Sequence, residues 1–184
     1  KPEDLFDSFK GDLEFRAKDG QIYYSVGLFR ILEFINATEM YRGKLPDMKK
    51  EGLLYKLISA RGSFQNGRFT IKEITLDGPT MEMVAQGEID LAGGKVNLTV
   101  LVAPLKTVDR IIKKIPLVRD ILAGTLVVIP VRVSGDLKDP KVNPISPSGV
   151  GSELLATMKR TLGLPFKLVE PLIPRKKEES GEER

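Results

Sequence analysis

The chain has no cysteine, no histidine and no tryptophan among its 184 residues. Without cysteine it can form neither a disulfide nor a thiolate nucleophile. Without histidine and cysteine it also lacks the usual zinc and copper ligand sets and the commonest general base. These absences argue against an enzyme and against a metal or other cofactor.

Long apolar runs are missing too, because no stretch reaches the roughly 18 to 20 apolar residues of a membrane span. The formal charge is only +4, and no run of five like charges marks an arm that would bind nucleic acid. The apolar share of 41% nevertheless argues for a folded protein with one core-bearing domain. Because the chain begins at Lys1 with neither methionine nor a signal sequence, we expect a piece of a longer polypeptide.

Residues 61–104 organise the chain as consecutive antiparallel strands, since apolar side chains recur at every second position. The turn signals between them are Asn66-Gly67, Asp77-Gly78-Pro79 and Gly93-Gly94. An Asn-Gly pair tolerates the positive φ angles of a tight hairpin, so Phe64 and Phe69 should flank the first turn. One face of this meander would be apolar, and the other would carry Lys72, Glu82, Gln86, Glu88, Asn97 and Thr99.

Strands are also expected on either side of this stretch. Residues 11–25 predict a hairpin around Asp19-Gly20, a weak repeat of the hairpin at 62–79. Residues 125–144 predict the last long strand. Within it Pro130 lacks a ladder donor, which suggests an edge position or a bulge.

Three helices are predicted, near 26–38, 105–122 and 152–162. The first has Ser25 as its N-cap and is apolar nearly all round, so it must be buried against a sheet or face lipid or a partner. The second is basic and amphipathic, which suits either a sheet edge or an anionic membrane surface. The third would be capped by Ser152 and ended by Gly163.

These elements predict an α+β fold: a curved, mostly antiparallel, groove-like β-sheet with three or so helices packed on or within it. We expect the curved-sheet domain over 1–144, followed over 145–174 by a linker, a short amphipathic helix and an apolar tail. Residues 175–184 form a charged tail that we expect to be disordered. The apolar surface exceeds what one thin layer of sheet can hide, so helices, lipid or a partner must cover it.

Three stretches carry ordered turn motifs. Residues 42–91 contain a polar RGKLPDMKKEG loop, a GSFQNGRF hairpin, an ITLDGP turn and a GEIDL strand end. KKIPLVRDILAG is followed by IPVRVSGDLKDPKVNP, and GLPFKLVEPLIP lies near the end. In their order and spacing these stretches resemble the C-terminal region of the AsmA-like family of bacterial envelope proteins (AsmA/TamB/YhdP type).

The resemblance implies the distal end of a longer, inner-membrane-anchored periplasmic protein, whose sheet groove carries phospholipid between the inner and outer membranes. It implies no catalytic residues. We expect acyl chains to lie against the inward groove residues Phe69, Ile71, Met81, Met83, Val100 and Val131. The alternative is a scaffold module that docks another envelope protein during outer-membrane biogenesis. Contact with a membrane surface or such a partner would come from Lys113, Lys114, Arg119, Phe166, Leu168 and Leu172.

Overall fold

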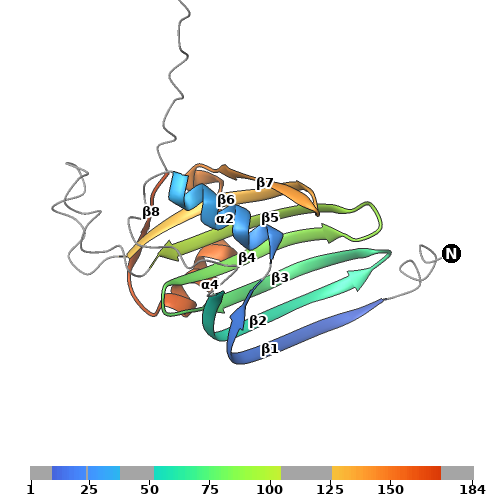
Figure 1. Cartoon of the computed structure of the whole chain (residues 1–184), viewed down its shortest axis with the longest axis horizontal. Coiled ribbons are helices and arrows are strands. Elements are labelled where there is room, and N and C mark those ends of the chain that lie inside the picture. The colour runs from blue at the N-terminus through green and yellow to red at the C-terminus, as the bar shows by residue number, and fades with distance from the viewer. Residues whose placement is uncertain (1–9, 24, 38–51, 105–125, 171–184) are drawn as a thin grey trace, which may run out of the picture.

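The computed structural model describes residues 10–23, 25–37, 52–104 and 126–170 of the chain. These residues form one sheet in which seven antiparallel strands follow one another in chain order, and a short eighth strand pairs parallel with the sixth (Figure 1). The strands are β1 (Lys10–Ile22), β2 (Leu53–Gln65), β3 (Arg68–Asp77), β4 (Met81–Asp90), β5 (Lys95–Pro104), β6 (Leu126–Asp136), β7 (Asp139–Pro144) and β8 (Phe166–Leu168). The described helices are α2 (Val26–Ala37), α4 (Ser152–Leu162) and a short 3-10 turn at Pro147–Gly149.

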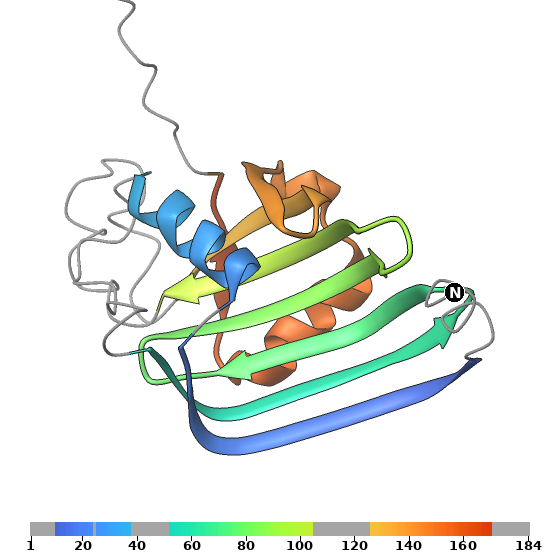
Figure 2. The ribbon, with the colours of Figure 1, turned by 45° about the vertical axis from the view of Figure 1, so that its right-hand side comes forward.

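The two α-helices lie on opposite faces of the sheet, which we call the α2 face and the α4 face (Figure 2). On the α2 face, Leu32 and Ile35 pack with side chains such as Met83 and Val100. On the α4 face, Met158 packs with Val84, Leu101 and Val128. Neighbouring residues of β4, β5 and β6 therefore enter different cores, and this explains why these strands are apolar without interruption.

Most of the predicted elements are confirmed within the described residues. The chain is α+β with a mostly antiparallel sheet, and Phe64 faces Phe69 across the Asn66-Gly67 turn. Ser25 caps α2, because its Oγ accepts a hydrogen bond from the Leu28 N–H at 3.3 Å. The N-cap predicted for α4 is wrong by one residue: Gly151 occupies that position, and Ser152 begins the helix. The helix predicted near 105–122 lies outside the described residues.

The predicted hairpin at 11–25 is wrong, because β1 is a single strand that runs through Asp19-Gly20. The pairing of Lys18 with Leu57 and of Gly20 with Tyr55 keeps one register on both sides of Asp19. Asp19 alone of this Asx-Gly pair has a positive φ, of 50°. A two-residue hairpin of the Asn-Gly kind needs positive φ at both central residues, so the chain bends here without reversing.

Both alternatives predicted for Pro130, an edge position and a bulge, are also wrong. β6 is an inner strand with β5 on one side and β7 and β8 on the other, and its pairing with β5 keeps one register through Pro130. The Pro130 carbonyl accepts from the N–H of Ile145, just beyond β7. Two residues earlier, the Val128 carbonyl accepts from the Val169 N–H beside β8, so both short strands lie along one edge of β6. Proline is tolerated at this junction because its missing donor faces the point where one neighbouring strand gives way to the other.

Candidate functional site: an apolar strip on the sheet

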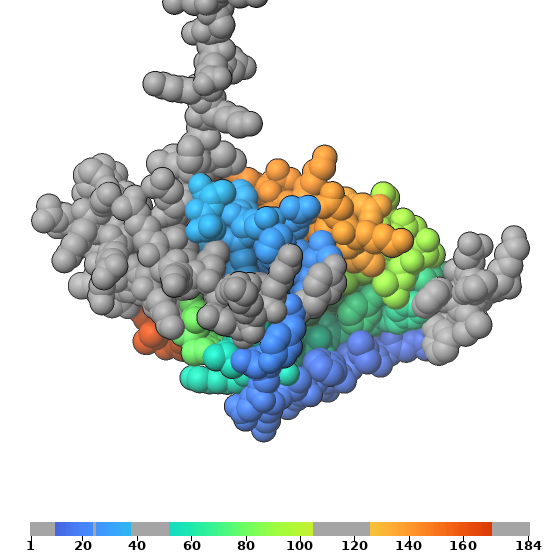
Figure 3. All heavy atoms as spheres, in the orientation of Figure 1, coloured from blue at the N-terminus to red at the C-terminus, as the bar shows by residue number. Residues whose placement is uncertain are grey.

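Part of the α2 face is apolar yet not buried. We define the apolar strip as the six residues Leu13, Phe15, Phe64, Phe69, Ile74 and Ile89, which lie on β1 to β4. Leu13 and Phe15 are each 50% exposed, and the other four are half-buried. Figure 3 shows α2 lying over β6 and β7, away from the edge formed by β1. The described helix therefore covers the other half of this face.

The cross-strand register explains why the strip is continuous. Phe64 pairs with Phe69, and Phe69 pairs with Ile89, so three strands place large apolar side chains side by side. Phe15 belongs to the next row, because it pairs with Ala60, which pairs with Ile74. Directly paired residues point to the same face of a sheet.

The strip ends in a hollow of about 520 Å³, where β2 turns into β3. Leu13, Phe64, Phe69, Ile89 and Leu91 line it, together with Lys10, Gly11 and Asp12. Its volume lies in the range of pockets that hold small molecules, and most of the lining side chains are apolar. Such a hollow suits a hydrocarbon segment.

Two local features hold the aromatic rings of this hollow in place. Asn66 and Gly67 have φ angles of 50° and 72°, which close the tight turn between Phe64 and Phe69. A Cβ atom on Gly62 would lie 2.4 Å from the Thr70 carbonyl oxygen and 2.9 Å from the Phe69 ring. Glycine at this position therefore lets the ring lie close against β2.

Of the six predicted groove residues, only Phe69 lines the hollow. The other five are buried, each at most 7% exposed: Ile71, Met81, Met83, Val100 and Val131. Four of them pack in the same core as α2, the exception being Ile71. The structure thus places them on the predicted face, but under other side chains. The prediction omitted Leu13, Phe15, Phe64, Ile74 and Ile89, although the alternation of β1 and the Asn66-Gly67 turn could have indicated the first three of them.

The two predicted contact residues that the structure describes are also separated from the strip. Phe166 and Leu168 lie in β8, where they are half-buried against the core under α4. The apolar tail therefore begins by joining the sheet as a parallel partner of β6. Lys113, Lys114, Arg119 and Leu172 lie outside the described residues.

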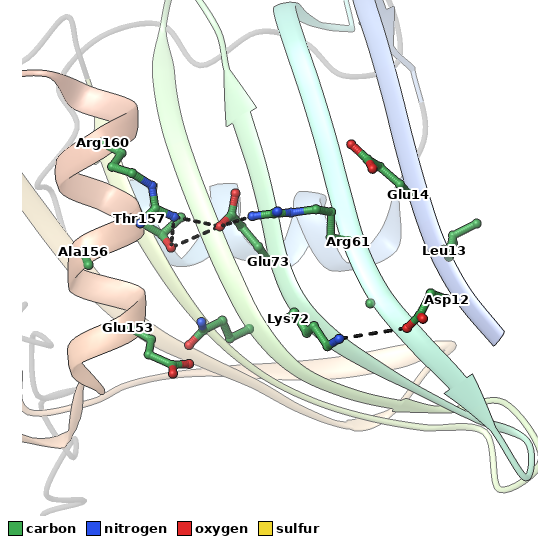
Figure 4. Close-up of a pocket in the computed structure, with 12 residues that line it drawn as sticks. Asp12, Leu13, Glu14, Arg61, Lys72, Glu73, Glu153, Ala156, Thr157 and Arg160 are labelled. Atoms are coloured by element: carbon green, nitrogen blue, oxygen red, sulfur yellow. Dashed lines mark hydrogen bonds and ion pairs between the residues drawn. The ribbon is translucent and has the colours of Figure 1, made fainter. Parts of the chain in front are cut away.

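A second hollow, of about 540 Å³, lies on the α4 face and is lined by charged side chains (Figure 4). β3 has an extra residue beside this hollow, because Ile71 pairs with Gly87 but Ile74 pairs with Ala85. This bulge turns Lys72 and Glu73 to the same face, where two consecutive residues of a regular strand would point to opposite faces. Glu73 Oε2 accepts from Arg160 at 2.8 Å and from Arg61 at 3.2 Å. Glu73 thus joins α4 to the sheet.

The largest electrostatic perturbation in the described residues lies at Glu82, also on the α4 face. Burial raises the pKa of Glu82 to about 7, and the charge of Asp77 on the neighbouring strand adds to the rise. Its Oε2 is buried and makes no hydrogen bond to the described residues. In contrast, the Lys138 N–H and the Lys95 charge lower the pKa of Asp136, whose carboxylate is exposed.

The described residues contain no group of three or more acidic side chains placed to hold a metal ion. Nor is any helix among them both long and apolar enough to cross a membrane. Comparison with protein-family models, with curated proteins and with solved structures gives no match.

Proposed function

We propose that this chain is a non-enzymatic lipid-binding module, the terminal part of a bridge-like protein that moves phospholipid between inner and outer membranes. It would act in the periplasm, as part of a longer protein anchored in the inner membrane. The observation that carries this proposal is the apolar strip, which runs across β1 to β4 and ends in the hollow beside Phe69. The resemblance of the turn motifs to those of the AsmA-like family is a second support for it.

An acyl chain would lie along the strip, against side chains that water now contacts. Covering apolar surface contributes about 25 cal/mol per Å² removed from water, so an extended hydrocarbon gains free energy along its whole length. The five buried groove residues would support this surface from within the core. The four that pack in the core with α2 would contact lipid only if α2 moved away.

The alternative, a scaffold module, has less support from the structure. It relies on the apolar helix and the apolar tail as docking elements. However, α2 buries Leu28, Ile31, Leu32 and Ile35 in the core of the α2 face. The described part of the tail is occupied as well, because Phe166 and Leu168 pack on the core under α4.

Native mass spectrometry of the gently purified full chain tests the proposal. We expect phospholipid to remain bound to the wild-type chain. Replacing Phe64 by glutamine removes one ring from the hollow, and we expect at least a fivefold loss of bound lipid, roughly the effect of losing one buried aromatic side chain. The matched control is Phe29→Gln, because Phe29 is 42% exposed on α2 and is not part of the strip.

Circular dichroism and thermal unfolding must first show that both variants are folded. A wild-type chain that retains no phospholipid would count against the lipid-binding function. Equal loss of bound lipid in the Phe64 and Phe29 variants would instead show that the lipid does not bind at the apolar strip.

A further inference from the structure

The two edges of the sheet differ in whether their backbone groups can pair with an added strand. Along residues 12–18 of β1, no described segment pairs with the outer edge. At the opposite edge, β7 carries Pro140 and Pro144. The odd-numbered positions of this segment bond to β6, as the hydrogen bond from the N–H of Ile145, just beyond β7, shows. The nitrogens of the two prolines, which carry no hydrogen, therefore face away from β6. Proline on an edge strand discourages further pairing. β1 contains no proline, so its edge can accept a strand.

The β2–β3 hairpin determines which residues of β1 bond to β2 and which direct their backbone groups outward. Gln65 and Arg68 close a two-residue turn, so they form a hydrogen-bonded pair and the odd residues of β2 bond to β3. The even residues of β2 therefore bond to β1, where their partners are Leu13, Phe15 and Ala17. The even residues of β1 then direct their N–H and C=O groups outward: Asp12, Glu14, Arg16 and Lys18.

The same four residues carry charges of both signs on exposed side chains. Asp12, Glu14 and Arg16 are 86%, 57% and 68% exposed, and Lys18 is exposed as well. Figure 4 shows Asp12 and Glu14 on the side of the charged hollow, whereas Leu13 points away from it. An edge that carried only lysine would repel a second copy of itself, but this edge does not.

Two copies of β1 are self-complementary in one antiparallel register, with Phe15 opposite Phe15. Asp12 then faces Lys18, and Glu14 faces Arg16, and the two-fold symmetry repeats both pairs. Each of the four residues whose backbone N–H and C=O groups point outward then lies opposite another residue of the same four, as hydrogen bonding between antiparallel strands requires. Opposite charges directly across a strand pair stabilise it.

The two nearest registers that keep the same backbone hydrogen-bonding positions pair the charged side chains less favourably. A shift of two residues one way places Glu14 opposite Glu14 and Lys10 opposite Lys18. A shift of two residues the other way places Arg16 opposite Arg16. Like charges directly opposite each other destabilise a strand pair, so the charge pattern selects the register centred on Phe15.

The α2 face agrees with this register. Phe15 and Leu13 are each 50% exposed and belong to the apolar strip, so together they form part of an exposed apolar patch at this edge. In the paired form the two Phe15 rings would be direct neighbours, and Leu13 would pack beside Ala17. The apolar strip of one copy would then continue into that of the other.

We propose that the outer edge of β1 pairs with β1 of a second copy of this chain, antiparallel and centred on Phe15, to form a two-fold symmetric dimer with one continuous sheet. The interface would comprise residues 12–18 of each copy and would end near Asp19, where the positive φ of 50° disturbs the edge. This inference does not depend on lipid binding, because it rests on backbone parity and charge.

Charge exchange tests the register. Sedimentation velocity of the full chain should show a species of about twice 20.4 kDa that dissociates on dilution. Glu14→Arg alone and Arg16→Glu alone should each weaken association about tenfold or more, because each turns two attractive pairs into repulsive ones. The double variant Glu14→Arg/Arg16→Glu should restore it, and so should mixing the two single variants. Lys141→Glu on the opposite edge strand is the matched control and should leave the dimer intact.

Cysteine cross-linking gives a second readout, because the natural chain has no cysteine. In Phe15→Cys, the two-fold axis places both sulfurs in directly opposed positions, with Cβ atoms about 4.5 to 5.5 Å apart. Oxidation by diamide should therefore link two copies. Leu13→Cys should not cross-link, because that position faces Ala17 of the second copy.

A wild-type chain that is monomeric at all concentrations up to 100 µM would overturn the proposal. So would a dimer that tolerates both single charge reversals, or one in which Leu13→Cys cross-links as readily as Phe15→Cys. A monomer whose β1 amides become protected only when a different protein is added would assign this edge to another partner, and would overturn the proposal equally.

Discussion

At the scale of single residues, Glu82 makes the stability of the fold depend on pH. Burial and the charge of Asp77, its direct cross-strand neighbour, raise the pKa of Glu82 from 4.5 to about 7. The folded state therefore holds the Glu82 proton more tightly than the unfolded chain does. This contribution to stability is fully present below pH 4.5 and is lost as the pH rises through about 7.

Glu82→Gln removes the titrating group while keeping the shape of the side chain. We expect the variant to be more stable than the wild type at pH 8 by about 1 to 2 kcal/mol, a value reduced from the full shift because the group is partly solvated. Near pH 4 the two should differ little. Urea unfolding at several pH values measures this difference.

Glu88→Gln on the same strand is the control for this experiment, because Glu88 is exposed. We expect it to leave the pH dependence of the wild type unchanged. Parallel pH profiles for the wild type and Glu82→Gln would show that Glu82 is ionised in the fold without cost.

At the scale of elements, α4 is fixed to the sheet by apolar contacts and by the Glu73 carboxylate. Glu73 is mostly buried, with 17% of its side chain exposed, and it bonds to Arg61 of β2 and Arg160 of α4. Both arginines are more than half exposed, so solvent screens these ion pairs. The carboxylate therefore contributes less than a fully buried pair would.

Glu73→Gln should lower the free energy of unfolding by about 1 kcal/mol, because the amide keeps the shape but loses the charge-assisted hydrogen bonds. It should also speed hydrogen exchange in α4 without affecting α2. The control is Lys72→Gln, at the neighbouring bulge position, where the only described ion pair spans 3.9 Å to Asp12. If α4 exchanges at the wild-type rate in Glu73→Gln, apolar packing alone holds the helix.

Some elements of the fold could be predicted from the sequence, and others could not. The hairpin at Asn66-Gly67 and both described helices could be predicted because turn residues, caps and periodicity act locally. Asp19-Gly20 could not be distinguished from a hairpin, because its outcome depends on the pairing of β1 with β2. The bulge at Lys72 and Glu73 gives no local signal either, since an extra residue is defined only against a neighbouring strand.

The candidate site was only partly predictable for the same reason. Alternation correctly assigned Met83 and Val100 to the face of Phe69, but it does not say which half of that face a helix covers. In the structure α2 lies against β7 and the core beside it, so those two residues are buried while Phe69 borders the hollow. The position of a covering helix is a property of the tertiary packing.

At the scale of the whole molecule, the sheet is covered unevenly. β5 and β6 have strands on both sides and apolar cores on both faces, and Leu101 and Ile129 are fully buried there. Among the strands that the structure describes, β1 has only β2 as a neighbour, and most of its residues are exposed. Local opening costs least where few apolar contacts are broken, so stability should fall from β6 toward β1.

Native-state hydrogen exchange should show both this gradient in stability and an alternation of protected and unprotected amides along β1. Amides of Leu101 and Ile129 should exchange only through global unfolding. In β1 of the single variant Glu14→Arg, at a concentration where sedimentation shows it to be monomeric, the amides of Leu13, Phe15 and Ala17 should be protected by β2. Those of residues 12, 14, 16 and 18 should exchange rapidly, because their N–H groups face outward. In the wild type at high concentration, pairing of the edge should protect these four as well.

Uniform protection along β1 in that variant would mean that another segment of the same chain covers the edge. Uniformly rapid exchange along β1 would mean that the strand detaches from β2 as a unit. In the first case the outward N–H groups would already be satisfied, and a second copy would gain nothing by pairing. In the second case Phe15 and Leu13 would lack the rigid backbone that both the apolar strip and the edge pairing require, since a mobile strand holds neither its register nor its face.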